Sequence, residues 1–469
     1  MLEYVKWRGD LSLNVAPMNE IDLLIFTQLS YLHFCDVLGS QGAPLRAAAR
    51  LVEAIPREPG NVQIVTDRHT LLAAVAESER FGNLTVSHCE DLFDPARAMQ
   101  FAAVTFGLPD GSHVVAFRGT DATVVGWKEN FNMSFACPVP SQSEAVRYLN
   151  DVAAATVGPL RLCGHSKGGN LALYSATGCT TEVRERITHI DLFDAPGLDN
   201  ATLATEGYRS VLPKVSAYVP QTSIIGQLMG VPEHYTVVHS TVTGMGQHNT
   251  FTWALNGPRF DTLPALDNTS KLIKATMDDF LIDSTPEKRQ LLVQTLFDVL
   301  GAANTHTFGE MADRWTDTAG ALWDAVWKLD GATLKAVLSI VGSLASSGAD
   351  SAKKFIAAYR DQSAGGNLAG VKNNVGYIGS DVTTTASGKE PANENGVTET
   401  ADKTISEVRT EKASHSDSNG TTKTTLTSGN SASNGTNGTN AVSGLASAGM
   451  ESLRKLIATF RDDSTQNKS

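Results

Sequence analysis

Residues 159–178, "PLRLCGHSKGGNLALYSATG", restrict the fold of this chain more than any other stretch. An apolar run stops abruptly at Gly-His-Ser-Lys-Gly, and a run with helical character follows at once. A G-x-S-x-G pattern alone is weak, because chains of this length and glycine content contain it by chance. Its context is more specific, since the serine of a nucleophile elbow occupies a sharp strand-to-helix turn with small residues two positions to either side. Gly164, Gly168 and Gly169 supply the small residues, and His165 directly precedes Ser166 in the elbow. The sequence therefore predicts that Ser166 is a catalytic nucleophile rather than a serine in an ordinary turn.

The segments on both sides of this turn alternate between extended and helical patterns. Residues 100–108 and 112–120 flank a Pro-Asp-Gly turn, as in a β-hairpin. A helical pattern leads into the elbow, and later apolar runs predict strands over 187–193, 214–220 and 235–240. Strands separated by helices form right-handed parallel crossovers in a sheet that is covered on both faces. We therefore expect an α/β fold with a mostly parallel sheet and helices on both faces.

Composition divides the chain into four parts. Residues 1–300 have a globular composition and hold the predicted sheet. Residues 301–363 are Ala-rich, with apolar residues at intervals of three and four, which predicts a helical extension. Residues 364–440 are rich in Ser, Thr, Asn, Gly and charge, and they hold too few large apolar residues to offset the entropy of ordering, so we expect a disordered linker. Residues 441–469 predict an amphipathic C-terminal helix.

The C-terminal helix repeats an earlier one. Residues 445–464, "LASAGMESLRKLIATFRDDS", align without a gap with residues 344–363, "LASSGADSAKKFIAAYRDQS". One interpretation is that both helices dock on the globular part or on each other. The alternative is a tethered helix that contacts a protein partner or a membrane surface.

The charge and cysteine content narrow the class of protein. The formal net charge is −12, so no global basic field favours nucleic acid or an anionic membrane as a partner. The N-terminal region has no apolar segment of signal-peptide length, and no stretch reaches the length of a membrane span, which favours a cytoplasmic location.

The cysteines are odd in number and lack metal-ligand spacing, so we expect reduced thiols and neither a disulfide framework nor a zinc site; they are Cys35, Cys89, Cys137, Cys163 and Cys179.

A serine nucleophile needs a base and an orienting acid. In hydrolases of the α/β class these residues follow the serine in the order acid, then His, each on a loop after a later strand. His248 lies in a Gly-rich loop directly after the predicted strand 235–240 and is the expected base. The other downstream histidines are less suitable, since His189 and His239 fall in predicted strands and His415 falls in the predicted linker.

Asp194 is the expected acid. It ends the predicted strand 187–193 and precedes Ala-Pro-Gly, which places it at the same edge of the sheet as the elbow. Asp191 lies inside that strand and should point into its packing. No carboxylate follows the next predicted strand, where most such folds place the acid and this chain has Gln221. The alternative interpretation is that Asp194 only caps the turn after its strand.

An oxyanion hole requires two preorganised N–H groups, one from the residue after the nucleophile and one from a loop after an earlier strand. Lys167 supplies the first. The segment "VVAFRGTD" ends an earlier strand, and we assign the second donor to Thr120, whose hydroxyl is a further orienting group. Arg118 is expected to be structural and paired with a core carboxylate.

These motifs together resemble those of a known family. "FRGT" followed by "GWKENFNMSF", then "GHSKGGNLALYSA", "FDAPGL", "VPQTSIIG" and "QHNTFTW", are similar to a bacterial Mbeg-like domain of unknown function, a branch of the α/β-hydrolases similar to the fungal-type, class-three lipases. The likeness covers about residues 1–260 and implies an α/β-hydrolase fold, with Ser166 as nucleophile, His248 as base and the "FRGT" segment in the oxyanion hole. Class-three lipases place their acid where this chain has Gln221, whereas pancreatic-type lipases place an Asp in a segment similar to "DLFDAPG", which supports Asp194.

The expected activity is that of a lipase-like serine esterase that cleaves an ester, or a thioester, of a small molecule or lipid through an acyl-enzyme. This chemistry needs no metal or organic cofactor. The apolar residues of "SIIGQLMG" either flank an acyl pocket, form a small lid or belong to the core; they are Ile224, Ile225, Leu228 and Met229. A peptidase or amidase with the same residues and a non-enzymatic scaffold that binds a partner through its C-terminal helices remain alternatives.

Overall fold

The computed structural model describes residues 1–301, apart from 40–41, 58–59, 122, 231, 233, 269, 272–273, 276–277 and 279–283. Except for residue 301, the predicted helical extension (301–363), the linker (364–440) and the C-terminal helix (441–469) lie outside the described residues, and so do both copies of the repeat. Within residues 1–301 and their gaps, no helix is both long and apolar enough to cross a membrane.

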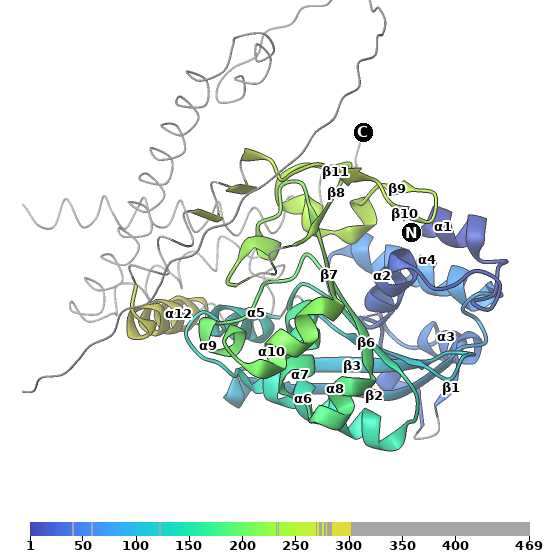
Figure 1. Ribbon diagram of the computed structural model, residues 1–469, viewed down its shortest axis with the longest axis horizontal. Helices are drawn as coiled ribbons and strands as arrows, with labels where there is room; N and C mark the ends of the chain where they lie inside the picture. Colours follow the sequence, from blue (N-terminus) through green and yellow to red (C-terminus); the bar gives the residue numbers. More distant parts are fainter. Residues whose placement is uncertain are drawn as a thin grey trace, which may run out of the picture. The chain divides into compact units, whose positions relative to one another are not determined.

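A nine-stranded sheet dominates the described part of the chain, in the order β1-β2-β3-β4-β5-β6-β7-β8-β11 (Figure 1). Its strands are β1 (Ala43–Pro44), β2 (Thr85–Asp94), β3 (Met99–Gly107), β4 (His113–Phe117), β5 (Leu160–His165), β6 (Ile187–Phe193), β7 (Val215–Pro220), β8 (Thr236–Val238) and β11 (Thr262–Leu263), and a separate ribbon consists of β9 (Leu255–Asn256) and β10 (Arg259–Phe260). Strands β4 to β8 are parallel, whereas β1 to β4 pair antiparallel and β11 is antiparallel to β8. The expected parallel sheet is therefore confirmed for β4 to β8. The short connection between β3 and β4 permits only an antiparallel pair.

Helices cover both faces of this sheet, as expected (Figure 1). The helices are α1 (Leu2–Arg8), α2 (Glu20–Leu29), α3 (Leu45–Val52), α4 (Val62–Glu77), α5 (Val124–Asn132), α6 (Pro140–Ala155), α7 (Lys167–Gly178), α8 (Thr181–Arg186), α9 (Asn200–Leu203), α10 (Glu206–Val211) and α12 (Pro286–Gly301). Short 3-10 turns are η1 (Phe34–Asp36), η2 (Pro95–Arg97), η3 (Leu212–Lys214), η4 (Ile225–Gln227), η5 (Gly244–His248) and η6 (Thr250–Thr252).

Two apolar cores follow from the alternation of side chains along the strands. In β3, Val104 and Phe106 pack with residues of α1 to α4, while Phe101 and Ala103 pack on the opposite face with residues of α6, α7 and α10. Strand β4 alternates in the same way. The sheet is thus held between two helical layers, which fixes the ends of its parallel strands relative to one another.

Helix α2 is the most deeply buried helix of the first layer. A capping box at Asn19 and Asp22 starts it, and all residues from Ile21 to Leu29 are buried. The Asp22 carboxylate also accepts hydrogen bonds from Arg80 Nε and from the Tyr4 hydroxyl, both at 2.8 Å. Arg80 and Asp22 form a fully buried ion pair.

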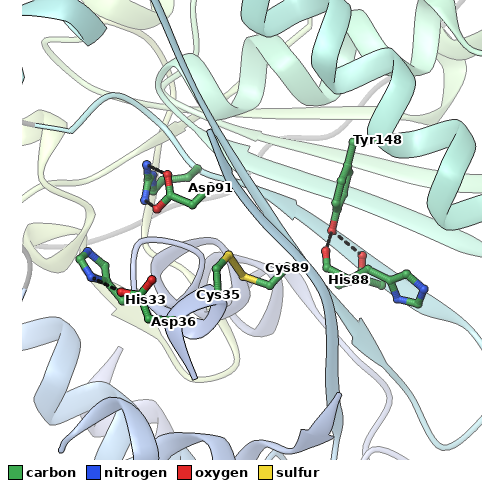
Figure 2. The surroundings of a disulfide bond; sticks show 9 residues. His33, Cys35, Asp36, His88, Cys89, Asp91 and Tyr148 are labelled. Carbon is green, nitrogen blue, oxygen red and sulfur yellow. Dashed lines mark hydrogen bonds and ion pairs between the residues drawn. A yellow bond between two sulfur atoms is a disulfide. The ribbon is translucent and has the colours of Figure 1, made fainter. Parts of the chain in front are cut away.

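The cysteines differ from the sequence-based expectation. Cys35, in η1, and Cys89, in β2, form a disulfide, so the prediction that all five thiols are reduced is wrong for this pair (Figure 2). Figure 2 shows the bridge between η1 and β2, with the Tyr148 hydroxyl bonded to the His88 carbonyl oxygen nearby. The two cysteines are 54 positions apart, and only the packing of η1 against β2 brings them together. Cys163 and Cys179 are free and buried, and Cys137 is free and exposed.

Candidate active site

Ser166 lies on a sharp turn between β5 and α7. Strand β5 ends at His165 and α7 begins at Lys167, as the sequence predicts. Ser166 has φ 56° and ψ −130°, a conformation that L-residues seldom adopt. Non-glycine residues in such conformations cost about 1–3 kcal/mol and cluster at functional sites. The conformation of Ser166 is therefore the strained serine turn expected of a nucleophile elbow.

The glycines around Ser166 are required by close backbone contacts. A Cβ atom added to Gly164 would lie 2.2 Å from the carbonyl carbon of Gly168. A Cβ atom added to Gly168 would lie 2.1 Å from the carbonyl oxygen of Phe117 and 2.9 Å from the backbone nitrogen of Gly119. The small residues thus bring the elbow against the C-terminal end of β4.

Asp194 and His248 are directly bonded to each other. His248 Nδ1 lies 2.6 Å from Asp194 Oδ2, and because a carboxylate only accepts, the imidazole donates from Nδ1. Asp194 follows the last residue of β6, and His248 ends η5 in the loop after β8. The structure brings these two predicted residues together, and the tautomer that results leaves His248 Nε2 as the acceptor.

Asp194 is held in place by further donors. The Ser223 hydroxyl donates to Asp194 Oδ1, and the Gly226 backbone N–H donates to the same oxygen at 3.1 Å. Asp194 is 1% exposed and has φ 43°. Its carboxylate is thus surrounded by donors, which fixes the oxygen that faces His248. Sequence reasoning did not identify Ser223 and Gly226 as partners, although both lie in the motif "VPQTSIIG".

The turn that carries Ser166 contacts the loop that carries His248. Among the described residues, no hydrogen bond joins the Ser166 hydroxyl to the His248 ring. The ring of His165, the residue before the serine, lies 4.4 Å from the His248 ring, centre to centre, with 36° between the ring planes. The contact between the two segments therefore runs through the side chains of His165 and His248.

His165 connects three parts of the site. Its Nε2 donates to the carbonyl oxygen of His248 at 2.9 Å, and its Nδ1 therefore accepts from the Tyr31 hydroxyl at 3.2 Å. Burial lowers the pKa of His165 well below its usual value, and the neighbouring His248 ring adds to this shift. His165 is accordingly neutral at neutral pH. Tyr31 was not singled out from the sequence, since it lies 134 positions away from His165.

Other predicted residues take structural positions. Gln221 Nε2 donates to the Ser240 carbonyl oxygen at 3.0 Å, and Gln221 Oε1 accepts from Ser240 N at 2.7 Å, so this side chain joins the segments after β7 and β8. Asp191 is buried within β6, as expected. Burial raises the pKa of Asp191 well above its usual value. Arg118 forms two hydrogen bonds to the Asp91 carboxylate, at 2.7 and 2.8 Å, which confirms its pairing with an acid. The acid is not the expected core carboxylate, because Asp91 is exposed on β2.

A second His–Asp pair lies elsewhere. His239 Nδ1 is 2.9 Å from Asp261 Oδ2, and both side chains are about two-fifths exposed, at 42% and 44%. It has the same chemistry as the Asp194–His248 pair but no serine turn beside it. It therefore supplies a matched comparison for experiments on the candidate site.

The two residues assigned to the oxyanion hole lie on adjoining segments. Lys167 is the first residue of α7, and Thr120 follows the Gly119 segment that contacts the elbow. A Cβ atom on Gly119 would lie 2.6 Å from the His165 carbonyl oxygen, so this loop is packed on the turn itself. The Thr120 hydroxyl accepts a hydrogen bond from Asn130 Nδ2 at 2.6 Å. The backbone of both residues is thus anchored near Ser166.

The structure is a mixed α/β fold with a strained serine at a strand-to-helix turn and a bonded His–Asp pair in the segments after β6 and β8. Residues 75–298 match the model of the Mbeg1-like family. No curated protein matches the sequence.

Solved structures similar to this chain include three lipases. The M37 lipase shares 15% identity over 45% of this chain and 69% of its own, with a TM-score of 0.29. A fungal lipase in complex with an inhibitor shares 14% identity over 47% of this chain and 78% of its own, with a TM-score of 0.28. A deletion mutant of the Rhizomucor miehei lipase in complex with its propeptide shares 14% identity over 54% of this chain and 74% of its own, with a TM-score of 0.30.

Proposed function

We propose that this protein is a lipase-like serine hydrolase that cleaves a carboxylic ester through an acyl-enzyme on Ser166. The observation that carries the proposal is the hydrogen bond from His248 Nδ1 to the buried Asp194 carboxylate, beside a serine held at φ 56°. A base with its tautomer fixed by an acid, next to a nucleophile on a strained turn, is the arrangement that serine acyl transfer requires.

The reaction proceeds in two halves. Ser166 Oγ attacks the ester carbonyl carbon while His248 Nε2 takes the hydroxyl proton, and the carbonyl electron pair moves to the oxygen. The backbone N–H groups of Lys167 and Thr120 stabilise this oxyanion. The intermediate collapses, the bond to the alkoxy group breaks, and His248 returns the proton to the departing alcohol. Water then attacks the acyl-enzyme by the same route and releases the acid and Ser166.

The substrate class follows from the residues that adjoin the Asp194 loop. The "SIIGQLMG" segment supplies two donors to Asp194, and its apolar residues are half-buried, namely Ile224, Ile225, Leu228 and Met229. Half-buried apolar side chains next to a polar reaction centre favour an acyl chain over a charged group. We therefore assign an ester of a small molecule or lipid as the substrate.

Labelling by a fluorophosphonate tests the proposal. The reagent forms a covalent bond only with an activated serine, and mass spectrometry locates the modified residue. The full chain should be labelled at Ser166, and the label should vanish in Ser166→Ala and His248→Ala and fall strongly in Asp194→Asn.

The second His–Asp pair provides the control. His239→Ala and Asp261→Asn remove a His–Asp hydrogen bond of 2.9 Å from a pair outside the site, and labelling of Ser166 should be unchanged in both. Absence of label in folded wild-type protein would overturn the hydrolase proposal and favour the scaffold alternative. Equal losses in the control variants would also contradict it, because they would show that any loosened His–Asp pair abolishes reactivity.

A further inference from the structure

The Lys167 side chain is fully buried, although it belongs to the residue directly after Ser166. Its Nζ donates to the Gln100 carbonyl oxygen, to Gln100 Oε1 at 3.1 Å and to Glu129 Oε2 at 3.0 Å. Both charged side chains of the Lys167–Glu129 pair are 0% exposed. Burial lowers the pKa of Lys167, and the Glu129 carboxylate opposes this shift. A buried ion pair thus joins the first residue of α7 to α5.

The Glu129 carboxylate holds more than the lysine. Its Oε2 also accepts from the backbone N–H of Gln100, in β3, at 3.0 Å, and its Oε1 accepts from the backbone N–H of Ser141, in α6, at 2.8 Å. One side chain of α5 therefore bonds to a strand and to two other helices. This arrangement fixes the position of α5 against the elbow.

The same helix contacts the other proposed oxyanion residue. Asn130, next to Glu129, donates to the Thr120 hydroxyl, and a Cβ atom added to Gly126 would lie 3.0 Å from Thr120 Cγ2. Helix α5 thus touches Thr120 through two residues and Lys167 through Glu129. A shift of α5 would therefore change the distance between the two proposed donors, Lys167 and Thr120.

We propose that Glu129 is a positioning residue for the oxyanion hole. By bonding to Lys167 Nζ, Glu129 fixes α5 against the elbow. It thereby keeps the backbone N–H groups of Lys167 and Thr120 directed at the position of the oxyanion. The proposal rests on the proposed serine hydrolase function and names a residue that touches no substrate itself. Oxyanion donors accelerate acyl transfer only when they lie at hydrogen-bond distance from the developing charge.

The rates at which an ester and its thionoester are hydrolysed distinguish a positioning role of Glu129 from a merely structural one. The oxyanion of an ester accepts strong hydrogen bonds, whereas the larger sulfur of a thionoester accepts them poorly, so the ratio of the two rates reports the alignment of the donors. The probes are p-nitrophenyl butyrate and its thiono analogue, used with the full chain. Loss of folded protein lowers both rates equally and leaves their ratio unchanged.

The variants are Glu129→Gln and the double variant Glu129→Gln with Lys167→Met. The double variant keeps the Lys167 backbone N–H position and removes both buried charges, so it folds without an unpaired ion. In both proteins we expect kcat for the ester to fall about 10- to 100-fold, less than the roughly 10²- to 10³-fold loss on removal of an oxyanion donor, because the donors are displaced and not removed. KM should change by less than about threefold, since ground-state binding is retained. The ratio of ester to thionoester rates should fall roughly tenfold.

Asp22→Asn is the matched control, because Asp22 and Arg80 form an equally buried ion pair at α2. It should lower stability and leave the ratio at the wild-type value. A wild-type ratio in folded Glu129→Gln and in the double variant would overturn the positioning role while the hydrolase proposal stands. A wild-type protein that hydrolyses neither probe and is not labelled at Ser166 would overturn both.

Discussion

His165 Nε2 donates a hydrogen bond of 2.9 Å to the carbonyl oxygen of His248, across 83 positions of sequence. The residue before the proposed nucleophile thereby holds the backbone of the proposed base. Gln247 adds a second restraint, because its side chain bonds to the Thr222 backbone N–H at 2.9 Å and to the Thr222 hydroxyl at 3.0 Å. The loop that carries His248 is therefore fixed from the elbow on one side and from the segment after β7 on the other.

The buried His165 makes stability depend on pH. Its pKa in the folded protein is lowered well below 6.5, chiefly by burial, whereas in the unfolded chain it is ordinary. Below pH 6.5 the unfolded chain binds a proton that the folded protein does not, so the free energy of unfolding falls with falling pH, by about 1 kcal/mol per pH unit. Urea denaturation at pH 7, 6 and 5 measures this slope.

The variant His165→Asn separates the contribution of His165 to this pH dependence from the contributions of the other histidines. Asn keeps a donor and an acceptor but does not titrate, so the fall between pH 7 and pH 5 should be smaller by about 1 kcal/mol per pH unit. Burial also lowers the pKa values of His113 and His189, but these residues contribute equally to both proteins and cancel in the comparison. Identical slopes in the two proteins would show that His165 is not the titrating group.

Ser166→Gly should stabilise the protein while it removes the proposed nucleophile. Glycine adopts φ 56° without the strain that a Cβ atom causes, and the Ser166 side chain makes no capping hydrogen bond that the change would lose. Relief of strain outweighs the greater entropy of glycine in the unfolded chain, so we expect a gain of about 1 kcal/mol over Ser166→Ala. Denaturant unfolding of the two variants is the measurement. A less stable glycine variant would contradict a strained turn.

The sequence predicted the parts of the fold that depend on local patterns. Strand β6 has the predicted bounds, and α7 begins directly after the serine turn as expected. Both predictions depend on the periodicity of apolar residues and on the glycines of the elbow, which can be seen in consecutive residues. The proximity of Asp194 and His248 also followed, since residues after parallel strands meet at one edge of the sheet. Their catalytic roles stay a prediction.

The remaining contacts depend on tertiary packing, and no local sequence pattern predicts them. Tyr31 and His165 are bonded across 134 positions, and Glu129 and Lys167 across 38. Glu129 follows Lys128, the other charged residue of the short helix α5, and nothing in the neighbouring sequence distinguishes a buried carboxylate from a solvated one. The disulfide was missed for the same reason, because pairing depends on where η1 packs rather than on cysteine spacing.

Asp194→Asn should lower kcat far more than it lowers stability. The Asn side chain still accepts from Ser223 and Gly226 through its carbonyl oxygen, but its NH₂ group then faces His248 Nδ1. Nδ1 becomes the acceptor, the proton moves to Nε2, and His248 no longer accepts a proton from Ser166. We expect kcat for a p-nitrophenyl ester to fall by about 10⁴-fold, the effect of this change in serine proteases. Asp261→Asn should leave kcat unchanged, and equal rates in wild type and Asp194→Asn would exclude Asp194 as the acid.

Reduction of the Cys35–Cys89 bridge should lower the stability of the folded protein. The bridge joins two residues 54 positions apart and so closes a loop in the unfolded chain, and the lost loop entropy corresponds to about 4 kcal/mol at most. Urea denaturation with and without a phosphine reductant measures this difference. Cys35→Ala with Cys89→Ala should match the reduced wild type and should no longer respond to the reductant, whereas Cys163→Ala should keep the full response, because that thiol is free. Peptide mapping under non-reducing conditions should recover the two cysteines as one linked pair; two free thiols there would contradict the bridge.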